Sequence, residues 1–275
     1  MTIPRGKGLI LLAAAIVVVN GFFPAVWILF TSLKSEAELV SKPITWWPHD
    51  PTLANYVQAF TDQPLLRYLG NSFAVAVLST ILSLFVASLA AYAIARLNLR
   101  HRRLILTCIV ASSMFPLVTL LVPIFQTMRS LNLLNTYTAL VLPYTVLNLP
   151  VCTLVLVSFF QSIPRDLENA AMIDGCTRLG ALWRVVVPLA APGVFTAGIL
   201  AFVNAWDEFL LALSLNASAT MRTLPVGITL YQGEFTFPWP IISAALVVAI
   251  VPVAVLIAVF QERVVGGLTQ GGLKG

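Results

Sequence analysis

The chain alternates six long stretches that carry no charged residue with short polar segments. A helix of about 20 apolar residues crosses a hydrocarbon core of about 30 Å. In lipid, the hydrogen bonds of the backbone are satisfied only in helices or closed β-barrels, and the chain lacks the alternation of apolar and polar residues that is typical of β-strands. The pattern therefore predicts an all-α membrane protein, one transmembrane domain over residues 1–275. Its six expected spanning helices cover approximately residues 9–33, 69–95, 104–128, 138–160, 189–213 and 239–261.

Composition supports this class of protein. Hydrophobic residues make up 59% of the chain and charged residues 10%, and the mean hydropathy is +0.93. So few polar groups would not cover a water-soluble globule of this length. The first apolar stretch is roughly twice as long as an export-signal core, so we interpret it as a retained helix.

Basic residues predict the orientation. With the N-terminus in the cytoplasm, 11 of the 16 Lys and Arg residues fall on the inside, and the run Arg100–Arg103 is the strongest single indication. Both termini are therefore expected to be cytoplasmic. The net charge of +5 is accounted for by this topological excess, so no nucleic-acid partner is needed.

Prolines interrupt the apolar sequence of the third and fourth expected spans. Pro116 and Pro123 lie in the third, and Pro143 and Pro150 in the fourth. Proline removes a backbone hydrogen bond and bends a helix. Bent helices are common beside transport pathways, although they also occur in membrane proteins that have none.

A polar segment at residues 164–188, between the fourth and fifth expected spans, predicts a helix, a turn and a second helix. Pro164 suits a first helical turn, and Asp166 and Glu168 place negative charge at the positive end of the helix dipole. Gly175 can adopt the left-handed conformation that ends a helix, and Thr177 is a suitable N-cap for the next one. The segment is either a connector lying on lipid headgroups or a docking site for a cytoplasmic protein.

The spacing within this segment is specific. Glu168, Asn169, Ala170 and Ala171 are followed after three residues by Gly175 and, nine residues later, by Val185–Pro188. This arrangement resembles the EAA loop of binding-protein-dependent ABC transporter permeases, here at residues 164–188. Further stretches resemble the MalG-type carbohydrate importers of that superfamily: Thr31–Lys34, Trp46–Pro48, Asn71–Ser72, Ala90–Leu97, Ala205–Phe209 and Gly267–Gly275.

The resemblance implies a type I ABC importer permease fold with six transmembrane helices and a cytoplasmic coupling helix in a bacterial inner membrane. It implies a second permease subunit, two ATPase subunits that bind ATP and Mg, and an extracytoplasmic sugar-binding protein as partners. The residues expected to couple to the ATPase are Glu168, Asn169, Ala170, Ala171, Asp174 and Gly175.

The chain departs from the family pattern at two positions in this loop. Asn169 stands where the family usually has Glu, and Cys176 where it usually has Ala. The first change removes a charged contact with the ATPase, for which the neighbouring Glu168 is expected to compensate. The chain has no Gly-rich phosphate loop of the Walker type, so we expect no enzymatic activity, no cofactor and no metal bound by this subunit.

Polar residues gather near the outer end of the fifth expected span. Asn204, Trp206, Asp207, Glu208 and Asn216 offer carboxylate, amide and aromatic groups, which suit the hydroxyls and the ring face of a sugar. A carboxylate near the hydrocarbon core costs free energy, so its presence indicates either a functional role or contact with water. Three interpretations stay open for the two acids: binding the sugar, closing an external gate, or simply reaching the membrane interface.

The external loop that follows, from Asn216 to Trp239, resembles the segment that reaches into the binding protein in this family. Gly233, Glu234 and Phe235 are its expected contact residues.

The leading hypothesis from the sequence is thus the permease subunit of an ATP-driven sugar importer. A permease for another solute, such as glycerol phosphate or a peptide, is the alternative within the same class. Phosphate is modestly disfavoured, because the basic residues fall near the membrane edges or outside. A channel or membrane scaffold is the alternative from another class, but the sequence has neither a charged pore ring nor an arginine-repeat helix.

Overall fold

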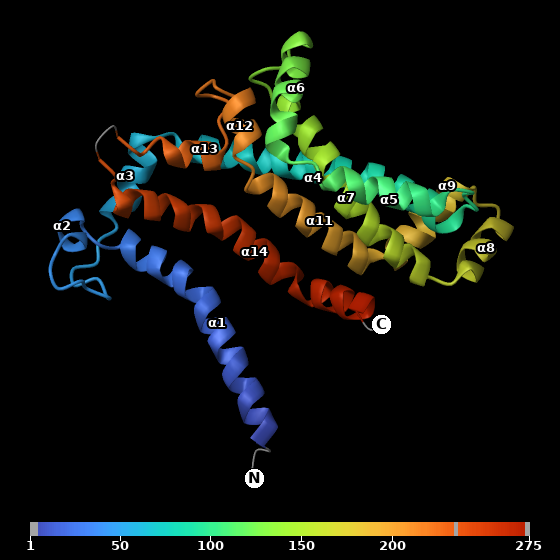
Figure 1. The fold of residues 1–275 in the computed structure, drawn as a ribbon, viewed down its shortest axis with the longest axis horizontal. Coiled ribbons are helices and arrows are strands. Elements are labelled where there is room, and N and C mark those ends of the chain that lie inside the picture. The colour runs from blue at the N-terminus through green and yellow to red at the C-terminus, as the bar shows by residue number, and fades with distance from the viewer. Residues whose placement is uncertain (1–4, 234–235, 273–275) are drawn as a thin grey trace. The chain divides into compact units, whose positions relative to one another are not determined.

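A computed structural model describes residues 5–233 and 236–272, and every regular element in those ranges is a helix (Figure 1). This confirms the all-α class. The elements are α1 (Arg5–Ser32), α2 (Glu36–Leu39), α3 (Ala54–Asp62), α4 (Leu65–Arg96), α5 (Arg102–Ser113), α6 (Leu117–Ser130), α7 (Tyr137–Ser162), α8 (Arg165–Ile173), α9 (Arg178–Ala181), a π-helical stretch (Leu182–Val186), α10 (Val187–Leu189), α11 (Ala191–Trp206), α12 (Leu210–Leu215), α13 (Leu224–Thr229) and α14 (Trp239–Gly272).

Backbone contacts group these helices into two compact units. Unit 1 contains the described residues up to Leu66 together with Gly227–Pro252. Unit 2 contains Arg67–Val226 and the described residues from Val253 onward. Each unit is considered by itself below, and the single domain expected from the sequence stays a prediction.

Four of the six expected spans are continuous helices. They correspond to Gly8–Ser32, Leu65–Arg96, Tyr137–Ser162 and Trp239–Phe260, each long and apolar enough to cross a membrane. Pro143 and Pro150 lie inside the continuous helix α7. The third expected span consists of two helices joined at a sharp bend, and the fifth begins just after a second such bend.

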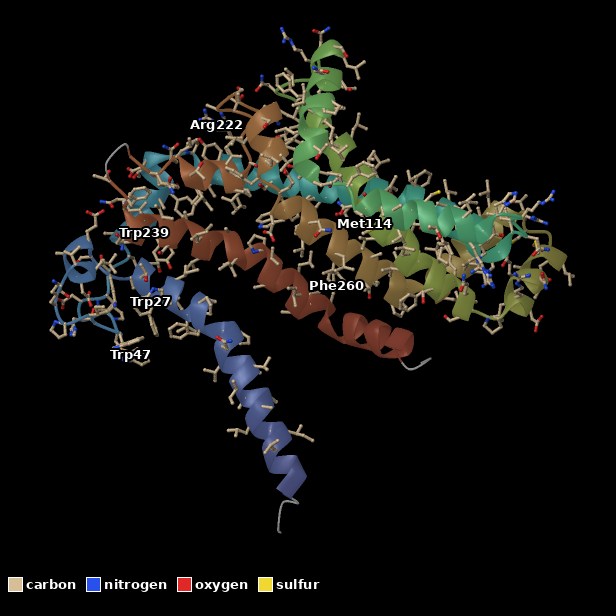
Figure 2. All side chains as sticks on the ribbon, in the orientation of Figure 1. Trp27, Trp47, Met114, Arg222, Trp239 and Phe260 are labelled. Atoms are coloured by element: carbon tan, nitrogen blue, oxygen red, sulfur yellow. The ribbon has the colours of Figure 1, made fainter. Side chains whose placement is uncertain are left out.

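The third span breaks between α5 and α6, which meet at 90°. The break falls at residues 114–116, and Pro116, with no N–H to donate, stands at the N-cap of α6. Met114, labelled in Figure 2, lies at this corner. Pro123, by contrast, is accommodated inside α6, where the Thr127 hydroxyl donates to its carbonyl oxygen at 2.8 Å. Of the two prolines, Pro116 therefore marks the break.

The fifth span also differs from its expected bounds of 189–213. The helix before Ala190 and helix α11 meet at 83°, and α11 ends at Trp206. Residues 207–209 interrupt the helix before α12 begins at Leu210. The expected boundary between the polar segment, which ends at residue 188, and the fifth span, which begins at 189, lies at the first break. The second break, at residues 207–209, was missed, since periodicity does not record where a polar side chain caps a helix end.

The core of unit 2 lies between α4, α7 and α11. Small residues face one another there, among them Ala87, Ala91, Ala197 and Ala201, all buried. Larger side chains such as Phe160 fill the remaining space. Small residues let membrane helices approach closely, and this packing holds the ends of α4 and α7 where α8 begins.

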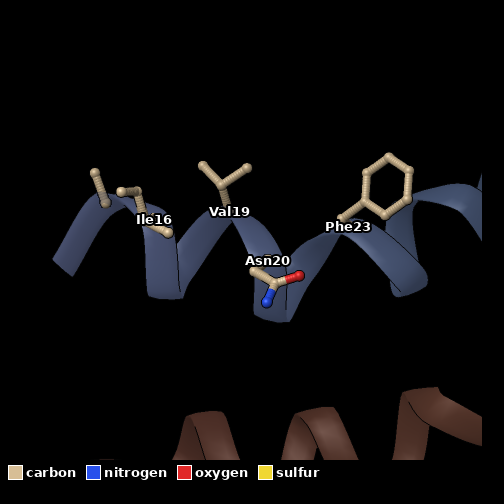
Figure 3. A pocket seen from close by; sticks show the side chains of 5 residues that line it. Ile16, Val19, Asn20 and Phe23 are labelled. Atoms are coloured by element: carbon tan, nitrogen blue, oxygen red, sulfur yellow. The ribbon is translucent and has the colours of Figure 1, made fainter. Parts of the chain in front are cut away.

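Helix α1 of unit 1 keeps its apolar side chains on the surface of the chain. None of its most apolar window is buried. Figure 3 shows part of this surface, a shallow depression lined by Ala15, Ile16, Val19, Asn20 and Phe23, in which Asn20 contributes a polar amide. A helix that is apolar on all sides requires lipid or another protein around it.

A short cap follows α1 and is closed by polar contacts. Lys34 is buried, donates to the Thr45 carbonyl oxygen and lies over the Trp27 ring, 5.5 Å from its centroid. Glu38 accepts hydrogen bonds from the Thr45 hydroxyl at 2.9 Å and from the His49 N–H at 3.0 Å. Trp27 and Trp47 mark this region in Figure 2.

Candidate functional site

The segment expected to couple to an ATPase forms a helix, a left-handed turn and a second helix at one end of unit 2 (Figure 1). Helix α8 starts after Pro164, with Asp166 and Glu168 in its first turn. Gly175 has φ +92°, which confirms the expected turn. Thr177 caps α9 as expected, its hydroxyl accepting from the Gly180 N–H at 3.1 Å.

The end of α8 is a complete Schellman motif. The Cys176 N–H donates to the Ala171 carbonyl oxygen at 2.9 Å, and the Gly175 N–H donates to the Met172 carbonyl oxygen at 3.1 Å. These two bonds satisfy carbonyl groups that a helix terminus leaves unpaired, and they require a left-handed residue between them. Gly175 therefore fixes the angle between α8 and α9 through the backbone alone.

Glu168 occupies a different position from the one expected. Its carboxylate is buried and forms an ion pair with Arg96 at the end of α4, with 3.2 Å between Nε and Oε2. The Tyr92 hydroxyl donates to its other oxygen. A direct charged contact between Glu168 and an ATPase, in compensation for Asn169, is therefore the wrong interpretation, because both carboxylate oxygens already have partners within the chain.

Arg96 also reaches the end of α7. Its Nη2 donates to the carbonyl oxygen of Ile163, the residue after α7, at 2.9 Å. One buried guanidinium thus joins α4, the end of α7 and α8. Sequence reasoning missed Arg96 and Tyr92. Their four-residue spacing on one helix face, with a charge at the end of an apolar span, is the signal that could have indicated them.

The outward face of this segment combines small, polar and apolar side chains. Asn169, Ala170 and Asp174 are exposed, and Ile173 and Leu179 keep 86% and 58% of their surface accessible. We call these five residues the α8–α9 surface. Exposed large apolar side chains beside polar ones are typical of a protein contact surface.

Glu208 caps a helix. Its carboxylate accepts from the Leu211 N–H at 2.8 Å and the Ala212 N–H at 3.1 Å, both in the first turn of α12. The Tyr144 hydroxyl of α7 donates to the same carboxylate. These contacts give the carboxylate a structural role within unit 2, and its place in the substrate pathway stays a prediction.

Two other expected pathway residues are structural as well. Asn216 is buried, and its amide donates to the carbonyl oxygens of Thr136 at 3.2 Å and Met221 at 3.3 Å. Trp206 is also buried and stacks on Phe202 with 5.6 Å between ring centroids. Both side chains are buried within unit 2, and their expected place in the substrate pathway stays a prediction.

Asn204 and Asp207 remain on the surface of unit 2. The Asn204 amide donates to Oδ1 of Asn148 at 3.2 Å, and the Asn148 amide donates to the Ala201 carbonyl oxygen at 3.3 Å. The two asparagines therefore form a polar ladder between α11 and α7. Asn148, which sequence reasoning missed, orients Asn204 at this surface.

Of the residues expected to contact a binding protein, Gly233 donates its N–H to the Thr236 carbonyl oxygen at 3.0 Å. Glu234 and Phe235 lie outside the described residues.

Spanning helices, two of them sharply bent, carry on one end an exposed helix–turn–helix attached by a buried ion pair. This architecture is typical of a membrane transport subunit. The chain belongs to the family of binding-protein-dependent transport system inner membrane components, whose family model matches residues 83–269.

Two relatives match this chain over nearly its whole length. The sulfoquinovosyl glycerol transport system permease protein SmoH of Agrobacterium fabrum is 75% identical over 98% of this chain and 95% of that protein. The trehalose/maltose transport system permease protein MalG of Thermococcus litoralis is 36% identical over 97% and 96%.

The fold also matches a solved structure. A chain from a bacterial ABC transporter involved in the import of the acidic polysaccharide alginate superposes with a TM-score of 0.80. The match covers 95% of this chain and 99% of that one at 21% identity. It confirms the importer permease fold expected from the sequence.

Proposed function

We propose that this chain is one of two permease subunits of an ATP-driven importer that receives a sugar from an extracytoplasmic binding protein. The observation that carries this proposal is the α8–α9 surface at the end of a bundle of apolar helices, in a chain of the binding-protein-dependent family. A docking segment of this kind is needed when another subunit hydrolyses the ATP that drives transport. The ATP and Mg would be bound by two partner ATPases that contact α8 from the cytoplasm, with both termini on that side.

In this assembly, coupling is mechanical. Asn169, Ala170, Ala171 and Asp174 present a face of α8 to the ATPase, and Gly175 sets the angle at which the movement of α8 reaches the helices behind it. Glu168 acts from inside the chain, through Arg96.

The second permease is expected to complete the translocation pathway. Helix α1 buries none of its most apolar window within this chain, so lipid and a partner subunit would have to surround it. Asn204 and Asp207 are the proposed sugar-facing groups of this half. Gly233, Glu234 and Phe235 remain the proposed contact with the binding protein.

For the substrate, we propose sulfoquinovosyl glycerol. The support is the 75% identity over nearly the whole length to a permease of that transport system, against 36% for the trehalose/maltose relative. A sulfonated glycoside carries a permanent negative charge, and the basic residues of this chain fall near the membrane edges or outside. We therefore expect the binding protein and the partner permease to supply the cationic contacts.

Reconstitution tests this proposal. Proteoliposomes that contain the chain with its partner permease, ATPase and binding protein should accumulate sulfoquinovosyl glycerol only when ATP is supplied, and should prefer it to trehalose. Preference for trehalose would overturn the substrate and leave the sugar permease in place. Uptake of either sugar without ATP would overturn the importer.

A further inference from the structure

The ion pair between Glu168 and Arg96 lies within a pocket that carries an excess of positive charge. The pocket has a volume of about 220 Å³. Among the residues that the structure describes, its lining includes three arginines, from α4, α8 and α9, and one carboxylate. They are Arg96, Arg165, Arg178 and Glu168.

Glu168 therefore balances charges that come from three separate elements. Without it, the arginines of α4, α8 and α9 would face one another across a partly enclosed space. Arg96 is buried, whereas Arg165 and Arg178 are exposed, so solvent screens the charges of these two. Replacing Glu168 by a neutral residue should leave the buried Arg96 guanidinium without its counter-charge, which weakens the attachment of α8 to α4.

Arg96 and Glu168 lie at the junction between α8 and the ends of α4 and α7, through which a movement of α8 would be transmitted. Arg96 is the last residue of α4 and donates to the Ile163 carbonyl oxygen just after α7, while Glu168 lies one turn into α8. Tyr92, one turn before Arg96 on α4, donates to the same carboxylate. The contact therefore connects the docking segment to the two long helices of unit 2 at a single point.

We propose that Glu168 is a positioning residue which, by pairing with Arg96, transmits the movement of α8 to α4 and α7. This inference rests on the proposed function, because it assigns a route for motion that the ATPase would start. Loss of the pair should leave ATP hydrolysis intact and separate it from sugar movement.

The test uses the complete importer in proteoliposomes and measures sugar taken up per ATP hydrolysed. In Glu168→Gln this ratio should fall about tenfold, which corresponds to a coupling free energy of ~1.4 kcal/mol between contacting charged residues. The matched control is Asp166→Asn, the same acid-to-amide change at an exposed position in the same turn of α8. It should keep the wild-type ratio.

Two further variants separate transmission from simple loss of fold. Arg96→Gln keeps an amide that can donate to the Ile163 carbonyl oxygen but removes the ion pair, so the ratio should fall about tenfold, as in Glu168→Gln. Tyr92→Phe keeps the ion pair and removes one hydrogen bond, so a loss of about two- to tenfold is expected. If Glu168→Gln fails to reach the membrane, these two variants decide the question.

The proposal is overturned if Glu168→Gln, present in the membrane, transports like Asp166→Asn. It is equally overturned if Arg96→Gln or Tyr92→Phe, present in the membrane, keeps the wild-type ratio. None of these results affects the proposed function. That fails only if the wild-type chain recruits no ATPase or takes up no sugar with its partners.

Discussion

Replacing Gly175 tests whether a left-handed turn between α8 and α9 is necessary for transport. Its φ is +92°, and a Cβ built at this position would meet no atom within 4 Å. The cost of a side chain is therefore that of the backbone conformation alone, about 1–2 kcal/mol for alanine. Valine should cost more because it is β-branched, and asparagine less because it tolerates this region.

A free energy of ~1–2 kcal/mol shifts the population of the native turn by about five- to thirtyfold. We expect sugar uptake in Gly175→Ala to fall by this factor while ATP hydrolysis continues, with the order Asn, Ala, Val from mildest to most severe. Uptake and hydrolysis are measured together on the reconstituted importer, with the amount of chain in the membrane determined by immunoblot.

The control for this series is Gly70→Ala. Gly70 lies in helix α4, and a Cβ there also meets open space, so alanine should be neutral or slightly stabilising. If Gly175→Ala and Gly175→Val took up sugar as well as Gly70→Ala, the turn would not set the coupling geometry and the reasoning would fail.

Three other substitutions test the remaining assignments. Gly193→Ala would place a methyl group 2.3 Å from the Phe159 ring, and overpacking by about 1–3 kcal/mol should lower the unfolding temperature in detergent; an unchanged temperature would contradict the close packing of α7 and α11. Glu208→Ala removes the acceptor for two N–H groups and should lower the unfolding temperature, at a cost of about 1–3 kcal/mol. Asp207→Asn should instead raise the KM for uptake and leave stability unchanged. The opposite pattern would show that Asp207 is the structural residue and Glu208 the one that faces the sugar. Asn216→Ala leaves two backbone carbonyls without their shared donor and should cost about 1–3 kcal/mol, seen as less folded protein after size-exclusion chromatography; wild-type recovery would show that Asn216 is not a structural residue.

Local chemistry explains what the sequence could predict. The positive φ of Gly175 and the cap at Thr177 depend on neighbouring residues only, and both were predicted correctly. The long spans follow from apolar length, which the membrane thickness sets. Even Pro116 was recognised as a source of bending, although the 90° corner before it was not.

Sequence reasoning misjudged polar side chains whose partners are distant in sequence or are backbone N–H groups at the start of a helix. Tyr92 lies 76 residues before Glu168, so no pattern within the loop could show that this carboxylate faces inward. Glu208 looked like a costly acid near the membrane, since its partners are the backbone N–H groups of α12, which carry no sequence signal. For Glu208, the cost of a carboxylate near hydrocarbon correctly indicated a role, and the structure shows the carboxylate capping α12.

The central claim is that this chain converts ATPase movement into sugar import through α8. The most direct measurement is sugar uptake per ATP hydrolysed by the reconstituted importer, compared between wild type and Gly175→Val at equal membrane levels. The account predicts ATP-dependent uptake by the wild type and continued hydrolysis with little uptake by the variant. Equal ratios for both, or wild-type uptake that does not depend on ATP, would contradict it.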